Sequence, residues 1–292
     1  MRPYRDDSDS LLGTNTYLLG RGRSRILLDT GQGFPVWKEN LSSVLQAQSA
    51  TVSTCLLSHW HHDHIGGLSD FLELCPEAKV YKNKPNLDPD EKLNGQDIRD
   101  LSDGQTFSIG EGVDRFTIQA LHCPGHTADH MAFTVTESSD GDQGAMFTGD
   151  NVLGHGTAVF EDLAAYLDSL RLMSDRIGDG ARAYPAHGAV LENGKATIEM
   201  YIKHRQQRED EALRVLRTGS VDEVSNEEPS VEDVAREWSS MEMVKIIYKD
   251  VPENLHVPAE GGLLQVLRKL EGEGRVEKSD SGRWRLKQKA AL

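Results

Sequence analysis

The chain has 292 residues, of which 37% are apolar and 27% charged, so it can form one large domain and a smaller one. Its 47 acidic residues outnumber its 32 basic ones, giving a net charge of −15. This excess weighs against a broad nucleic-acid surface, because phosphate binding depends on lysine and arginine. No apolar run approaches the roughly 18 residues of a membrane span, and the first ten residues lack the apolar core of a signal peptide. We therefore expect a cytoplasmic protein without a membrane partner.

The three cysteines, Cys55, Cys75 and Cys123, lie far apart and show no Cys-x-x-Cys spacing. A reducing compartment is the simplest interpretation of this usage. We expect each cysteine to be a small core residue rather than a metal ligand.

From Thr14 to about Val190, short runs rich in β-branched and aromatic residues alternate with glycines and with helical patterns. Apolar residues at helical spacing predict helices at 36–48 and 161–176. Strands and helices mixed in this way predict layered sheets covered by helices. The predicted strands occupy residues 16–20, 25–31, 51–59, 78–82, 115–121, 130–136 and 144–150.

A long helix is expected from about 194 to 217, followed by an acidic, turn-rich segment, residues 219–230, that is typical of a linker. The tail, residues 231–292, combines amphipathic helices with a strand–turn–strand pattern and predicts a small winged-helix-like domain. Winged helices often bind nucleic acid, but this tail carries eleven basic and eleven acidic residues, so its charge does not decide the matter. We therefore divide the chain into a domain at 1–218, the linker and the tail.

The stretch SHWHHDHIGG, residues 58–67, places four histidines and an aspartate within six positions directly after a predicted strand. His59 and His61 are two apart, so at a strand end their side chains point to the same side. Asp63 and His64 follow in a turn, after which two glycines let the backbone fold away before a helix. Histidine has only an intermediate preference for burial, so packing does not explain the cluster. The pattern indicates a metal site.

Further candidate donors stand where other strands end. His126 lies in HCPGHTADH, Asp150 ends GAMFTGD, and His187 lies in YPAHG, each motif with a glycine that suits a sharp turn. The resulting set is too large for one zinc ion and suits two ions that share a bridging carboxylate. The candidate metal donors are His59, His61, Asp63, His64, His126, Asp150 and His187.

Four other histidines near these motifs are weaker candidates. His62 would point opposite to its neighbours, so we expect it to be exposed or to contact a metal-binding residue rather than the metal itself. The remaining three could line the site: His122, His130 and His155.

The motifs His-x-His-x-Asp-His, PGHT, TGD and PAHG, in this order over residues 59–188, resemble those of the metallo-β-lactamase fold superfamily. The segment LLDTG at 27–31 is similar to an early strand of that family. The resemblance implies a mixed α/β fold, an αββα sandwich with the site at one edge between two sheets, followed by the winged-helix-like domain. It assigns the first metal to His59, His61 and His126, the second to Asp63, His64 and His187, and a bridging position to Asp150.

The expected cofactor is two zinc ions per chain, with manganese or iron as alternatives, because nitrogen and carboxylate donors suit all three metals. Two such ions would lower the pKa of a water between them to roughly 7. Family analogy makes Asp63 the catalytic residue that holds this nucleophile or accepts its proton. The expected enzyme is a metal-dependent hydrolase that needs no serine or cysteine nucleophile.

One subgroup of the superfamily, which joins this domain to a winged-helix-like module, resembles the chain over nearly its whole length. The similar segments are residues 13–20, 148–170, 201–209 and 243–256. The subgroup includes fungal thioesterases that release aromatic polyketide acids, of the atrochrysone carboxylic acid type, from acyl-carrier proteins. It also includes mitochondrial endoribonucleases. Because family members usually begin with an additional strand, whereas twelve residues precede Gly13, we expect an incomplete first hairpin or a chain whose beginning is missing.

The acidic balance and the segment GDNVLGHGTAVFEDLAAYL, residues 149–167, favour the thioesterase. Basic residues in the tail keep a single-strand-specific endoribonuclease open as the alternative. The expected partner is therefore an acyl-carrier protein or a polyketide synthase, with RNA as the alternative substrate. A homo-oligomer also remains open.

Overall fold

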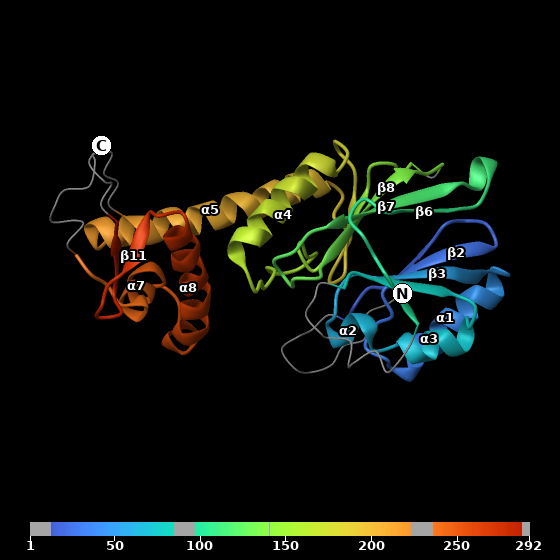
Figure 1. Ribbon diagram of the computed structural model, residues 1–292, viewed down its shortest axis with the longest axis horizontal. Helices are drawn as coiled ribbons and strands as arrows, with labels where there is room; N and C mark the ends of the chain where they lie inside the picture. The colour runs from blue at the N-terminus through green and yellow to red at the C-terminus, as the bar shows by residue number, and fades with distance from the viewer. Residues whose placement is uncertain (1–12, 85–96, 140, 223–235, 288–292) are drawn as a thin grey trace. The chain divides into compact units, whose positions relative to one another are not determined.

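The computed structural model describes residues 13–84, 97–139, 141–222 and 236–287 (Figure 1). The chain divides into two compact units, residues 1–201 and 202–292. The expected beginning of the first hairpin and most of the expected acidic linker lie outside the described residues. Within the described part of the chain, no helix is long and apolar enough to cross a membrane.

The first unit contains two five-stranded sheets. In the first sheet the strands stand in sequence order; β1 is antiparallel to β2, and the other pairs are parallel. Its strands are β1 (Tyr17–Leu19), β2 (Ser24–Leu28), β3 (Thr51–Leu57), β4 (Lys79–Lys82) and β5 (Ile98–Asp100). The second sheet runs in the order β10-β9-β8-β7-β6, with one parallel pair between β9 and β10. Its strands are β6 (Thr106–Ile109), β7 (Phe116–His122), β8 (Met131–Glu137), β9 (Met146–Gly149) and β10 (Ala183–Pro185).

The two sheets face each other across one apolar core. Ile26 and Leu28 of β2 belong to this core together with Phe133 of β8. Leu27, between them in sequence, points to the opposite face, because side chains alternate along a strand. There it joins a second cluster with α1 (Pro35–Ala47) and α3 (Leu68–Leu74). Figure 1 shows both helices beside the first sheet.

The helix α4 (Leu163–Arg176) contacts segments that follow strands of the second sheet. Its first turn is capped by Asp162, whose carboxylate accepts a hydrogen bond from a backbone amide, as helix starts require. From α4, Tyr166 donates to the carbonyl of Asn151, just beyond β9, and Ser169 donates to the carbonyl of Pro124, beyond β7. Helices therefore flank both sheets, and the expected αββα sandwich is confirmed.

All seven strands predicted from the sequence are present, with ends that differ by a few residues. Strands β5 (Ile98–Asp100), β6 (Thr106–Ile109) and β10 (Ala183–Pro185) were not predicted. The residues after His61 form a one-turn helix, α2 (His62–Ile65), where a turn was expected. The predicted long helix is α5 (Gly194–Thr218).

The second unit comprises the last part of α5, two helices and a hairpin. The helix α7 (Ser240–Ile247) begins with a capping box between Ser239 and Glu242. After a short 3-10 turn come α8 (His256–Gly272) and the antiparallel pair β11 (Val276–Lys278) and β12 (Trp284–Leu286). Two helices followed by this hairpin are the predicted winged-helix arrangement.

Candidate metal centre

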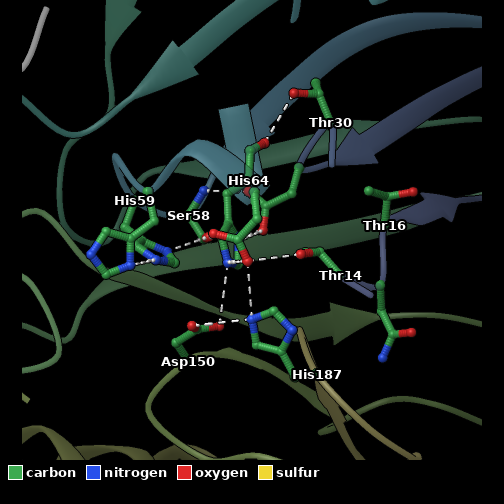
Figure 2. Close-up of polar contacts among 12 residues, drawn as sticks. Thr14, Thr16, Thr30, Ser58, His59, His64, Asp150 and His187 are labelled. Atoms are coloured by element: carbon green, nitrogen blue, oxygen red, sulfur yellow. Dashed lines mark hydrogen bonds and ion pairs between the residues drawn. The ribbon is translucent and has the colours of Figure 1, made fainter. Parts of the chain in front are cut away.

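All seven predicted donors come together at one end of the facing sheets. Their segments follow β3, β7, β9 and β10, so four turns bring these side chains close together. Figure 2 shows His59 and His64 on one side of this cluster, with Asp150 and His187 facing them. Within it, the geometry separates two groups of possible metal donors: His59, His61, His126 and Asp150 in one, and Asp63, His64 and His187 in the other.

The first group is a convergence of three imidazole nitrogens. Nε2 of His126 lies 3.2 Å from Nε2 of His59 and 3.0 Å from Nδ1 of His61, and these last two nitrogens are 3.0 Å apart. Nδ1 of His126 donates to the carbonyl of Val159 at 2.7 Å, which leaves its Nε2 facing the other two rings. Nδ1 of His59 likewise contacts Oγ of Ser58 at 3.0 Å. Three lone pairs aimed at one point repel each other unless a cation lies between them.

The second group combines one carboxylate with two imidazoles. Oδ2 of Asp63 lies 3.3 Å from Nε2 of His187 and 3.5 Å from Nε2 of His64. Asp150 contacts both groups: its Oδ1 is 3.4 Å from Nε2 of His64, and its Oδ2 is 3.3 Å from His187 and 3.5 Å from His126. Its carboxylate therefore lies between the two groups.

Residues behind the donors fix their orientation. Asp29, in the LLDTG segment, is buried and has a positive φ of 58°, a conformation rare for a residue other than glycine. Its carboxylate accepts hydrogen bonds from the amide and hydroxyl of Ser58, at 2.7 and 2.8 Å, and lies 2.8 Å from Nδ1 of His64. Such a contact holds the ring so that its Nε2 faces the cluster.

One histidine that the sequence left as a weaker candidate has a clear structural role. His130 is fully buried, its Nδ1 contacts the carbonyl of Cys123 at 3.1 Å, and its Nε2 accepts the amide of Asp150 at 3.0 Å. Burial, with a smaller contribution from nearby His126, lowers its pKa to about 3. His130 therefore positions Asp150 as a neutral ring. By contrast, His62 and His155 are exposed.

The two groups differ in charge. Burial lowers the pKa of His59 and His61, and nearby imidazoles lower it further, so both rings are neutral. Burial acts in the same direction on His64 and His187, but carboxylates outweigh it: the pKa of His64 is raised well above its usual value and that of His187 to about 9. Contacts with the same imidazoles hold the pKa of Asp63 low despite burial. A metal ion at the second group would therefore displace protons.

The donors fit divalent metal ions. Nε2 of His64 and Oδ1 of Asp150 are buried and lie 3.4 Å apart, and neither makes a hydrogen bond of good geometry among the described residues. Unpaired buried polar atoms are costly, and here both face the cluster, where a cation would satisfy them. Imidazoles with carboxylates are donors that zinc, manganese and iron accept. The three cysteines, predicted to be core residues, are buried and unpaired and belong to neither group.

A buried ion pair supports the loop of His126 and was not predicted from the sequence. Nζ of Lys82, in β4, lies 2.7 Å from Oδ2 of Asp129, and each side chain is only 1% exposed. The other carboxylate oxygen of Asp129 accepts the hydroxyl of Thr127 at 2.7 Å. The pair thus joins the first sheet to the loop that carries a donor of the first group.

Fold and site together define a member of the metallo-β-lactamase superfamily. The model of that superfamily matches residues 9–189, and that of the beta-lactamase associated winged helix domain matches residues 239–284. The chain therefore belongs to this family, and both the predicted fold class and the predicted tail are confirmed.

Curated relatives extend over most of the chain. A "Lactamase-like protein nscB" from Arthroderma gypseum is 42% identical over 269 residues, which cover 91% of this chain and 79% of that protein. A protein named "Atrochrysone carboxyl ACP thioesterase" from Aspergillus chevalieri is 40% identical over 270 residues, covering 91% and 78%. Among solved structures, a metallo-beta-lactamase family protein from Thermus thermophilus shares the fold with a TM-score of 0.65 at 20% identity, over 98% of this chain and 97% of that one.

Proposed function

We propose that this protein is a thioesterase that releases an aromatic polyketide acid from an acyl-carrier protein. The observation that carries the proposal is the complete set of donors in a chain 40% identical, over 91% of its length, to a protein named as such a thioesterase. An acyl-carrier protein or its polyketide synthase is the proposed partner, and the cytoplasm is the proposed location.

We assign two zinc ions to the two groups of donors. His59, His61 and His126 would hold one ion, Asp63, His64 and His187 the other, and Asp150 would contact both. When bound, the ions supply Lewis acidity, which polarises the thioester carbonyl and lowers the pKa of water. The contacts of Asp150 with both groups, at 3.3 to 3.5 Å, support its shared role.

Water is the proposed nucleophile. Burial raises the pKa of Cys55 well above its usual value and that of Cys123 to about 12, so neither thiol ionises near neutral pH. Ser58 is buried and donates its hydroxyl to Asp29. Asp63 is half-buried, and the neighbouring imidazoles keep its carboxylate ionised, so it can accept a proton from a water beside it.

The leaving group of the proposed reaction is the thiol of the carrier. Water adds to the thioester carbonyl, the carbon–sulfur bond breaks, and the products are a carboxylic acid and the thiol of the carrier. A thiol of this kind has a pKa near 8.5, so it can depart as a thiolate and take its proton from solvent. No separate acid residue is needed for that step.

Apolar side chains near the donors suit an aromatic acyl group. Trp60 lies between two donors in sequence, and its ring is 4.5 Å from that of His61. Val159, whose carbonyl binds His126, is 75% exposed, and Val190, three residues beyond His187, is 40% exposed. Exposed apolar residues beside a polar site are typical of contacts with an apolar ligand.

The basic residues of the tail, which kept the endoribonuclease open, largely have acidic partners. Lys269 pairs with Glu209 and Glu273, and Arg283 pairs with Glu242. Paired cations contribute less to binding phosphate, because that binding would have to break the existing ion pair. This pattern gives the RNA alternative no specific support.

The test compares thioester and RNA as substrates for the same metal-loaded protein. Aromatic acyl groups on pantetheine and on an acyl-carrier protein are the thioester substrates, and release of free thiol is followed by a colorimetric reagent. We expect hydrolysis that stops on chelation and returns with zinc, and no cleavage of single-stranded RNA. Metal-dependent RNA cleavage without thioester hydrolysis would contradict the proposal.

A further inference from the structure

The segment GTNTYLLG, residues 13–20, lies against the metal centre. Oγ1 of Thr14 donates to Oδ2 of Asp63 at 2.9 Å. Figure 2 shows the hydroxyl of Thr14 directed into the cluster of donors, whereas Thr16 lies away from it. The hydroxyl of Thr16 instead accepts the indole N–H of Trp37, at 3.0 Å. Neighbouring threonines of one segment therefore have different partners, one in the site and one in α1.

Asn15 holds the turn that carries His187. Its side-chain amide donates to the carbonyls of Pro185 and Gly188, at 3.0 and 2.9 Å, on either side of that histidine. Its backbone amide donates to the carbonyl of Ala186 at 2.6 Å. The backbone of Thr14 also forms an antiparallel bridge with His187 itself. Three hydrogen bonds from Asn15, one of them part of this bridge, thus fix this turn.

These contacts reach donors of one group only. Among the described residues, neither Thr14 nor Asn15 makes a hydrogen bond with His59, His61 or His126. Both donors that they do hold are partly exposed: the side chain of Asp63 is 31% exposed and that of His187 is 19% exposed. Exposed side chains lose more rotamer freedom when a metal binds them, so a fixed partner matters most there.

We propose that Thr14 and Asn15 are positioning residues that hold Asp63 and His187 ready for the second metal ion. The inference rests on the binuclear site of the proposed function. Thr14 orients a carboxylate, and Asn15 orients the turn of an imidazole, so the two consecutive residues bring together ligands that are far apart in sequence. The first metal group does not depend on them.

The experiment measures metal binding rather than turnover. Metal-free full-length protein is titrated with Co²⁺, whose visible absorption reports each coordination sphere, and with Zn²⁺ in competition with a chromophoric chelator. Thr14→Val removes the hydroxyl at nearly constant shape. It should weaken the second equivalent of metal by about 10–100-fold and leave the first unchanged.

Three further variants separate positioning from stability. Thr14→Ser keeps the hydroxyl and should restore the second equivalent. Thr16→Val is the matched control, because it makes the same change in the same segment but loses a contact outside the site; both equivalents should bind as in the parent. Asn15→Asp replaces the donating amide with an acceptor and should also weaken the second equivalent alone. Metal-free Thr14→Val and Thr16→Val should melt at similar temperatures.

Parental affinity for both equivalents in Thr14→Val would overturn the proposal, and so would equal losses in Thr14→Val and Thr16→Val. A parent protein that binds fewer than two equivalents would overturn the binuclear assignment and this inference with it. Two equivalents in the parent, with no selective loss in Thr14→Val, would overturn this inference alone.

Discussion

The two groups of metal donors are assembled in different ways. In the first, imidazoles such as His59 and His126 are buried and are oriented by Ser58 and by the carbonyl of Val159. In the second, protonated imidazoles face carboxylates, and half-exposed Asp63 is held by a hydrogen bond from the chain's N-terminal segment. Hydrogen bonds orient donors in both groups, but His59 and His126 are also buried, whereas the side chain of Asp63 is 31% exposed, so the two groups should respond differently to substitution.

The largest effect is expected where the groups meet. Asp150→Ala removes the carboxylate that contacts both, leaving His64 and His187 without a neighbour on that side. Both metals should be lost, and turnover should fall by roughly 10³-fold or more, because metal catalysis is worth several kcal/mol. Elemental analysis and thioester assays are the measurements. Asp168→Ala, an exposed carboxylate on α4, is the control, and two metals retained in Asp150→Ala would contradict the shared role.

A second test removes the buried ion pair that supports the loop of His126. Lys82→Met leaves the carboxylate of Asp129 buried without its cation, which should lower the free energy of unfolding by about 3–5 kcal/mol. Lys82→Met combined with Asp129→Leu should recover most of this loss, since a buried ion pair can often be replaced by apolar residues. Urea unfolding of metal-free protein measures both. A single variant within about 1 kcal/mol of the parent would show that the pair is dispensable.

Asp63→Ala should lower turnover and leave binding of the first equivalent of metal unchanged. Loss of this carboxylate removes the proposed proton acceptor, and turnover should fall by about 10²-fold or more, in line with general-base contributions. The first equivalent of metal and the circular dichroism spectrum should match those of the parent, because His59 and His61 are untouched. Near-parental turnover in the metal-replete variant would remove Asp63 from the reaction.

The smallest effect concerns the order in which metals leave. The second group is more exposed, and its imidazoles regain protons when the metal departs, so a chelator should remove that equivalent first. Its loss should lower the melting temperature by a few degrees, as expected for about 1–3 kcal/mol of linked binding energy. Timed chelation with parallel melting curves tests this. Simultaneous release of both metals would argue against separate groups.

The motifs predicted the candidate donors because each motif places a histidine or aspartate, which can bind metal, in a turn at the end of a strand. All seven donors therefore meet as expected, from His59 to His187. The supporting contacts could not be predicted in this way. Lys82 and Asp129 lie far apart in sequence, and nothing local in either segment marks them as partners. The hydrogen bond from Thr14 to Asp63 likewise depends on how the sheets face each other.

Three features of the structure were not predicted from the sequence, for local reasons. The short strands β5 and β10 are three residues long and owe their place to neighbouring strands rather than to their own pattern. His130 lies beside a donor motif, but nothing in the neighbouring residues indicates that its ring accepts a hydrogen bond from the amide of Asp150. Sequence patterns carry periodicity and spacing, whereas the supports of this site come from tertiary packing.

Because the donors come from four separate turns, the centre is complete only late in the synthesis of the chain. At about 5–20 residues per second, on the order of ten seconds pass between the emergence of His59 and that of His187 from the ribosome. During that interval the early histidines can meet cellular metal without their later partners. A chain that stops before β10 can therefore bind metal only in an incomplete way. Full metal occupancy thus marks a chain whose first unit has been made and folded to its end.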